Sequence, residues 1–75
     1  MNQVAEEYHG KDNVERATQE VMSQFGLDYE EAKPMAIKAL DGLESHGFGA
    51  DDFEAVKETI RVVVASWLGR EPRQK

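Results

Sequence analysis

Two similar octets occur in this chain, 23 positions apart, with Phe, Gly, Asp, Glu and Ala in register, and both combine a glycine with the start signal of an α-helix. The copies are residues 25–32 (FGLDYEEA) and residues 48–55 (FGADDFEA). An Asp at a helix N-cap accepts hydrogen bonds from the first free backbone N–H groups, and a Glu three residues later reaches back to the cap. The same D-x-x-E spacing occurs at residues 12–15. The sequence therefore predicts three helix starts.

A glycine follows each of the three predicted helices, at Gly26, Gly47 and Gly69. Glycine ends a helix easily because, without a Cβ atom, it adopts the left-handed conformation of a C-terminal cap at little cost. The offset between the octets is one helix plus its loop, and two copies are too few for a solenoid. Three helices with short connections favour an all-α fold, a small antiparallel three-helix bundle.

Apolar residues at three- and four-residue steps give each predicted helix one buried face. The helices are expected near residues 13–25, 29–46 and 52–68, and the third, which has the longest apolar arc, is expected at the centre of the core. The predicted core residues are Val14, Ala17, Val21, Met22 and Phe25 in the first helix, Tyr29, Ala32, Met35, Ala36, Ala39, Leu40 and Leu43 in the second, and Phe53, Val56, Ile60, Val63, Val64, Trp67 and Leu68 in the third. Leu27, just beyond Gly26, is expected to pack back on the first helix.

Three local features leave alternatives open. Pro34 either bends the second helix or marks a restart after one separate turn, since proline suits the first helical position. The β-branched run at residues 62–64 would also suit a strand, but a single strand has no partner in a helical chain. Trp67 is expected to anchor the core, and the alternative is a binding hot spot, where tryptophan is enriched.

The length of 75 residues predicts one domain with a marginal core of its own, so a stabilising partner chain is plausible. The bundle is expected over residues 12–69. Residues 1–11 are expected to form an arm that is either flexible or contains a short extra N-terminal helix around Val4 and Tyr8. Residues 70–75 are expected to form a polar, basic tail.

The formal net charge of −6 argues against direct binding of nucleic acid, which depends on clustered lysine and arginine. The chain has no cysteine, which rules out a disulfide framework and suits a reducing compartment. The start of the chain lacks the pattern of a signal peptide, and its longest apolar stretch is far too short to span a bilayer. We therefore expect a cytoplasmic protein with no membrane association.

A row of modest side chains on the back of the third helix is the first candidate binding surface. It consists of Ala55, Thr59, Val62 and Ser66, at steps of four, three and four residues. Small residues let another helix come close, and Val62 has no evident reason to face water. The alternative is an ordinary solvated surface, where scattered apolar residues are normal. The hypothesis is a surface for a partner helix or for a second copy in a homodimer.

A group of acidic residues is the second candidate surface, because antiparallel order brings the starts of the first and third helices beside the end of the second. It consists of Asp12, Glu15, Asp41, Glu44, Asp51, Asp52 and Glu54. Most of these lie at helix starts, where carboxylates cap free amides and complement the helix dipole. Asp41 and Glu44 lie near a helix C-terminus and lack that explanation. The hypothesis is that this acidic end meets a basic surface of a partner.

Catalytic, metal and cofactor sites are not expected. Asp51, Asp52 and Glu54 near His46 do not fit the frame of an EF-hand loop, and His9 and His46, each beside a glycine, resemble turn or cap residues. The serines have no recognisable base nearby, and a bundle of this size offers little room for a pocket of about 300 Å³ or more.

Three functions remain. The first is a small acidic protein-binding module, not an enzyme, that regulates or blocks a partner by helix-surface docking. The second is an inhibitor of the phage type, such as an anti-CRISPR or anti-restriction protein, whose acidic end mimics nucleic acid and occupies a basic groove. The third is an accessory subunit of a larger complex.

Overall fold

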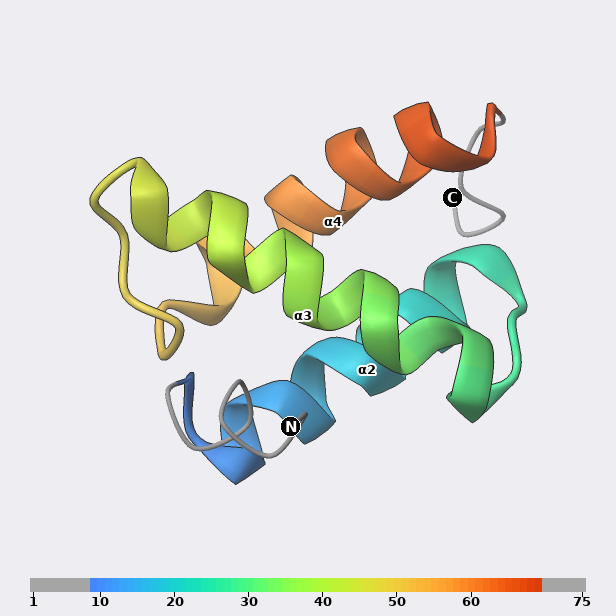
Figure 1. Cartoon of the computed structure of the whole chain (residues 1–75), viewed down its shortest axis with the longest axis horizontal. Coiled ribbons are helices and arrows are strands. Elements are labelled where there is room, and N and C mark those ends of the chain that lie inside the picture. The colour runs from blue at the N-terminus through green and yellow to red at the C-terminus, as the bar shows by residue number, and fades with distance from the viewer. Residues whose placement is uncertain (1–8, 70–75) are drawn as a thin grey trace.

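The computed structural model describes residues 9–69, and over this range it consists of three α-helices without any strand (Figure 1). The helices are α2 (Lys11–Phe25), α3 (Tyr29–Ser45) and α4 (Phe53–Leu68). Successive helices run in opposite directions, and each packs against the other two. The predicted three-helix bundle is therefore confirmed. The expected short helix around Val4 and Tyr8 and the tail at residues 70–75 lie outside the described residues.

The central helix of the bundle is α3, which lies between α2 and α4 in Figure 1. The expectation that the third helix would occupy this place is wrong, since α4 contributes the fewest fully buried side chains and α3 packs most extensively against α2. Alanines at positions 32, 36 and 39 explain the difference, because small side chains let α2 approach the α3 backbone closely. The buried apolar core consists of Val14, Ala17, Val21, Phe25, Ala32, Ala36, Ala39, Leu40, Leu43, Ala50, Val56, Ile60 and Val64.

The helix starts agree only in part with the repeated acidic signal. Asp52 is the N-cap of α4, where its Oδ1 accepts a hydrogen bond from the Ala55 N–H at 3.4 Å. Asp28 occupies the N-cap of α3 without a side-chain cap bond. Asp12 is not a cap, because α2 begins at Lys11 with Gly10 as its N-cap, and it lies in the first turn. Asp51, which is in register with Asp28 in the repeat, lies one residue before the α4 cap, so the second octet caps its helix one position late.

Pro34 lies inside a continuous α3 and is exposed, so the alternative of a restart at this residue is wrong. Its ring nitrogen has no hydrogen to donate to the carbonyl four residues earlier, at Glu30. This hydrogen bond is missing in the second turn of α3, on its solvent-exposed side, and the helix continues past it.

Trp67 is not a core residue, contrary to expectation. Its side chain is 44% exposed, and the Lys38 Nζ lies 5.4 Å from the centroid of its ring. The ring sits in the last turn of α4, where it packs beneath a lysine side chain from α3 and not inside the apolar core. A cation placed over an aromatic face in this way is attracted by the ring's quadrupole.

Candidate protein-binding groove

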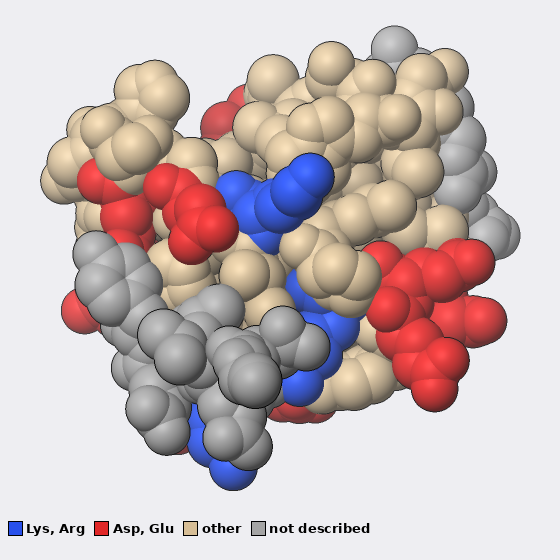
Figure 2. All heavy atoms as spheres, in the orientation of Figure 1, with Lys and Arg blue, Asp and Glu red and all other residues tan. Residues whose placement is uncertain are grey.

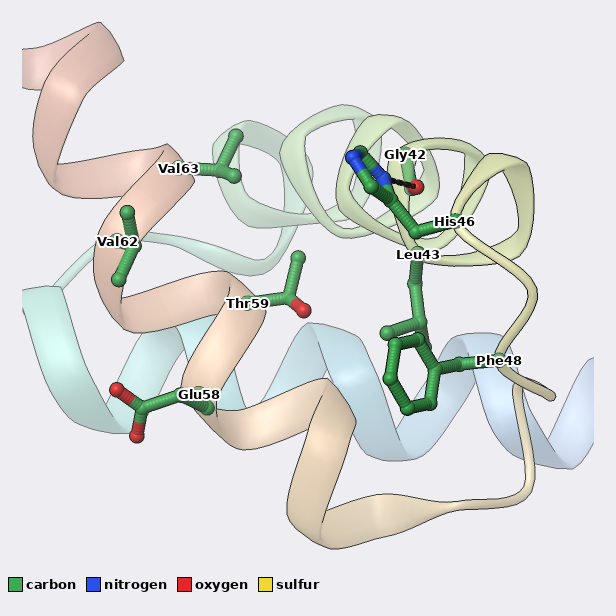
Figure 3. A pocket seen from close by; sticks show the side chains of 8 residues that line it. All are labelled: Gly42, Leu43, His46, Phe48, Glu58, Thr59, Val62 and Val63. Atoms are coloured by element: carbon green, nitrogen blue, oxygen red, sulfur yellow. Dashed lines mark hydrogen bonds between the residues drawn. The ribbon is translucent and has the colours of Figure 1, made fainter.

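A groove with a volume of about 330 Å³ lies between the C-terminal end of α3 and the middle of α4 (Figure 3). The expectation that so small a bundle has little room for a pocket of this size is wrong. The groove is open to solvent along one side, and most of its lining is apolar. The lining residues are Gly42, Leu43, His46, Phe48, Glu58, Thr59, Val62 and Val63.

Phe48 reaches the groove because of the way in which α3 ends. The Gly47 N–H donates to the Glu44 carbonyl at 3.0 Å, and the Phe48 N–H donates to the Leu43 carbonyl at 3.3 Å. This pair of bonds is a Schellman motif, which needs a left-handed residue and accordingly has Gly47 at φ 92°. In this motif the residue after the glycine packs on the helix three residues before its cap, here Phe48 on Leu43. Figure 3 shows the Phe48 ring directed from the loop into the groove beside Leu43.

The α4 wall of the groove contains Thr59, Val62 and Val63, which lie on one side of the helix at steps of three and four residues. Val62 is 59% exposed, and Phe48 on the opposite wall is 51% exposed. Both are large apolar side chains facing the same hollow (Figure 3). The bundle itself leaves this apolar surface uncovered.

Half of the predicted small-residue row belongs to the groove. Thr59 and Val62 line it, whereas Ala55 packs against the core and Ser66 is exposed outside the lining. Phe48, which also lines the groove, is absent from the surfaces predicted from the sequence. The sequence does contain a signal for the position of Phe48. A hydrophobic residue directly after a C-cap glycine usually packs on the last turn of the helix, which is the rule applied above to Leu27 after Gly26.

Two polar side chains mark the rim of the groove. His46 is the C-cap of α3, and its Nδ1 donates to the Gly42 carbonyl at 2.9 Å, so its predicted role as a cap residue is confirmed. Glu58 on α4 pairs with Arg61 one turn later, with 2.9 Å between Oε2 and Nη2. Both of these side chains are more than half exposed, so the pair contributes little to stability.

Asp41 and Glu44, the two acidic residues without a local explanation, both contact His9. The His9 ring is buried, with Nε2 2.7 Å from the Asp41 Oδ1 and Nδ1 3.2 Å from the Glu44 Oε2. The expectation that His9 is a simple turn or cap residue is therefore wrong. The imidazole joins the segment before α2 to the last part of α3, and these two carboxylates have a structural role.

As predicted, the starts of α2 and α4 lie at the same end of the bundle as the end of α3 (Figure 1), but Glu15 does not share the surroundings of Asp41 and Glu44. Glu15 turns to the beginning of α3, where its Oε1 accepts a hydrogen bond from the Tyr29 hydroxyl at 2.9 Å. Figure 2 shows acidic side chains gathered near both ends of α3, with lysine and arginine side chains between the two groups. The group near the start of α3 includes the exposed carboxylates of Asp28, Glu30 and Glu31. Asp12, Asp51, Asp52 and Glu54 are also exposed.

Over residues 9–69 no three His, Asp or Glu side chains are arranged so as to hold a metal ion. None of the helices in this range combines the length and the apolar character needed to cross a bilayer. Comparisons with protein-family models, with curated proteins and with solved structures find no match for this chain.

Proposed function

We propose that this chain is a cytoplasmic protein-binding module without enzymatic activity, which regulates or blocks a partner protein that docks in the groove between α3 and α4. The observation that carries the proposal is the pair Phe48 and Val62, two large apolar side chains more than half exposed on opposite walls of one hollow. Exposed apolar residues that adjoin one another are typical of interaction sites, whereas single ones are common on any surface.

Covering Phe48 and Val62 alone supplies only part of the binding free energy of a partner. Full burial of a valine or phenylalanine side chain stabilises by about 1.5–3 kcal/mol, so covering the exposed halves of Phe48 and Val62 contributes only a part of a micromolar affinity of about 8 kcal/mol. A partner that binds with micromolar affinity therefore needs contacts beyond these two side chains. The exposed face of α4 continues through Ser66 to Trp67, which offers a surface for that extension.

The test is partner capture with a matched pair of variants. Wild-type protein, Val62→Glu and Ser23→Glu are immobilised and exposed to nuclease-treated lysate, and bound proteins are eluted with a salt gradient. Ser23 is exposed on α2 away from the groove, so it controls for the added charge. We expect the wild type and Ser23→Glu to retain the same partner at high salt, and Val62→Glu to lose it while keeping its helical circular dichroism. Equal capture by all three would contradict the proposal.

A nucleic-acid mimic is the second candidate, supported by the exposed carboxylates of Asp51, Asp52 and Glu54 close to one another in sequence. Charge mimicry weakens steeply as salt rises, whereas an apolar interface persists. A basic nucleic-acid enzyme that elutes at modest salt, is captured by Val62→Glu and is lost when these three residues become Asn, Asn and Gln would establish the mimic instead. An accessory subunit, the third candidate, would unfold without a sharp melt when isolated.

A further inference from the structure

We infer that the occupant of the groove is a basic amphipathic helix, with apolar residues along one stripe and lysine or arginine on both sides of it. This inference rests on the proposed function and specifies the chemistry of the partner. It is carried by two observations, namely the shape of the groove and the charge of the chain segments around it.

The shape of the groove suits a helix. Its walls are two helices, and its α4 wall presents Thr59, Val62 and Val63 at the spacing that forms a ridge along a helix. Ridges of this kind pack into the grooves of another helix. A helix laid between α3 and α4 would add a further helix to the three in residues 9–69, with apolar anchors meeting Phe48 and Val62.

The charge around the groove favours a basic partner. All lining residues lie between positions 42 and 63, and the segment from Asp41 to Val63 holds six carboxylates and two lysine or arginine side chains, a formal charge of −4. The carboxylates belong to Asp41, Glu44, Asp51, Asp52, Glu54 and Glu58. Of the two cations, Arg61 is already paired with Glu58. The net negative charge of this segment therefore favours lysine or arginine on the partner.

The same charge disfavours a second copy of this chain. A homodimer through the groove would place one segment of charge −4 against another, and each copy carries −6 overall. Like charges facing each other across an interface are destabilising at low ionic strength. The hypothesis of a homodimer through α4 thus becomes one outcome of the test.

The experiment uses three synthetic peptides of about 18 residues, roughly five helical turns. The first has leucine at positions i, i+4, i+7 and i+11 with lysine flanks. The second keeps the leucines and has glutamate flanks, and the third keeps the lysines and has alanine in place of leucine. Each is titrated into ¹⁵N-labelled full-length protein at low salt, and the shifts of backbone amides are followed. Sedimentation of the protein alone is measured at low and high salt.

The leucine and lysine peptide is expected to bind at least about tenfold more tightly than either control peptide, because it alone has both the apolar anchors and the matching charge. The largest shifts should occur at Gly42, Phe48, Val62 and Val63. Val62→Ser, which removes apolar surface without adding charge, should weaken this peptide by about tenfold or more. Exchange of Glu54 and Glu58 for glutamine should weaken binding of the leucine and lysine peptide by about three- to tenfold at low salt. The same exchange should not weaken binding of the glutamate peptide.

Several results would overturn the inference while leaving the proposed function intact. Equal binding of the lysine and glutamate peptides would remove the charge requirement, and equal binding of the alanine peptide would show that the groove is not used. Self-association that Val62→Ser abolishes would make a second copy the occupant. Failure of all peptides, together with groove-dependent capture of a natural partner, would show that the partner is not a basic helix. The proposed function itself fails only when capture is the same for wild type and Val62→Glu.

Discussion

The Nε2 atom of His9 lies 2.7 Å from the Oδ1 atom of Asp41, across 32 positions of the chain. The other ring nitrogen faces Glu44, so the buried imidazole stands between two carboxylates of α3. A carboxylate only accepts hydrogen bonds, and the ring therefore donates to both partners at once only when it carries both protons.

Substitution His9→Ala is expected to lower the free energy of unfolding by about 1–3 kcal/mol, because it removes a buried hydrogen-bonding side chain. Asp41→Asn should cost less, about 1 kcal/mol or below, since the Asp41 side chain is 62% exposed and the pair is screened by water. Urea unfolding of both single variants and the double variant measures the coupling. Strict additivity of the two effects would show that the contact contributes nothing.

Two glycines of the α3 C-terminal region should respond to alanine in opposite directions. Gly47 has φ 92°, a conformation that an L-residue adopts only with strain, so Gly47→Ala should destabilise by about 1–2 kcal/mol. Gly42 lies inside α3, and an added Cβ would meet no atom within 4 Å, so Gly42→Ala should stabilise by about 0.5–1 kcal/mol. Urea midpoints that move in the same direction for both variants would contradict this account.

Replacement of Pro34 by alanine should stabilise the bundle. It restores the backbone hydrogen bond to the Glu30 carbonyl and removes the clash of the ring, which together cost up to about 3 kcal/mol in a helix interior. The more flexible unfolded chain offsets about 0.4–1 kcal/mol of this gain. We expect a net gain of about 1–2 kcal/mol, measured by thermal and urea unfolding. A lower melting temperature would mean that the structure depends on proline here.

The position of Trp67 predicts a small energetic role and an accessible ring. Trp67→Ala should cost about 1 kcal/mol or less, whereas Phe25→Ala, in the fully buried core, should cost about 3–5 kcal/mol. The native tryptophan fluorescence should also be quenched readily by acrylamide. Equal destabilisation by the two variants, or a ring shielded from the quencher, would place Trp67 in the core after all.

The fold could be predicted from the sequence because its signals are local. Helical periodicity and the glycines at positions 26, 47 and 69 define three helices, and the observed ends differ from the expected ones by two residues at most. Every fully buried apolar residue inside a helix belongs to the predicted faces. The place of α3 at the centre could not be read from apolar content, because close packing depends on small side chains as much as on large ones.

The groove and the His9 contact were harder to predict because they depend on distant residues. Thr59 and Val62 stood out as a surface row, but its partner wall is formed by Phe48, whose direction follows from the turn at Gly47. His9 lies more than 30 positions from Asp41 and Glu44, and no sequence period links them. The useful signal was the absence of a local reason for two carboxylates at a helix C-terminus.

The two phenylalanines that begin the repeated octets have opposite environments, since Phe25 is fully buried and Phe48 is half exposed. A change at Phe25 puts the whole bundle at risk, whereas a change at Phe48 alters mainly what the groove presents to solvent. If the groove binds a partner as proposed, folding and recognition depend on separate residues of the same repeated pattern. Under selection from a changing partner, such a chain can acquire a new binding preference by substitution at one loop position while its helices stay as they are.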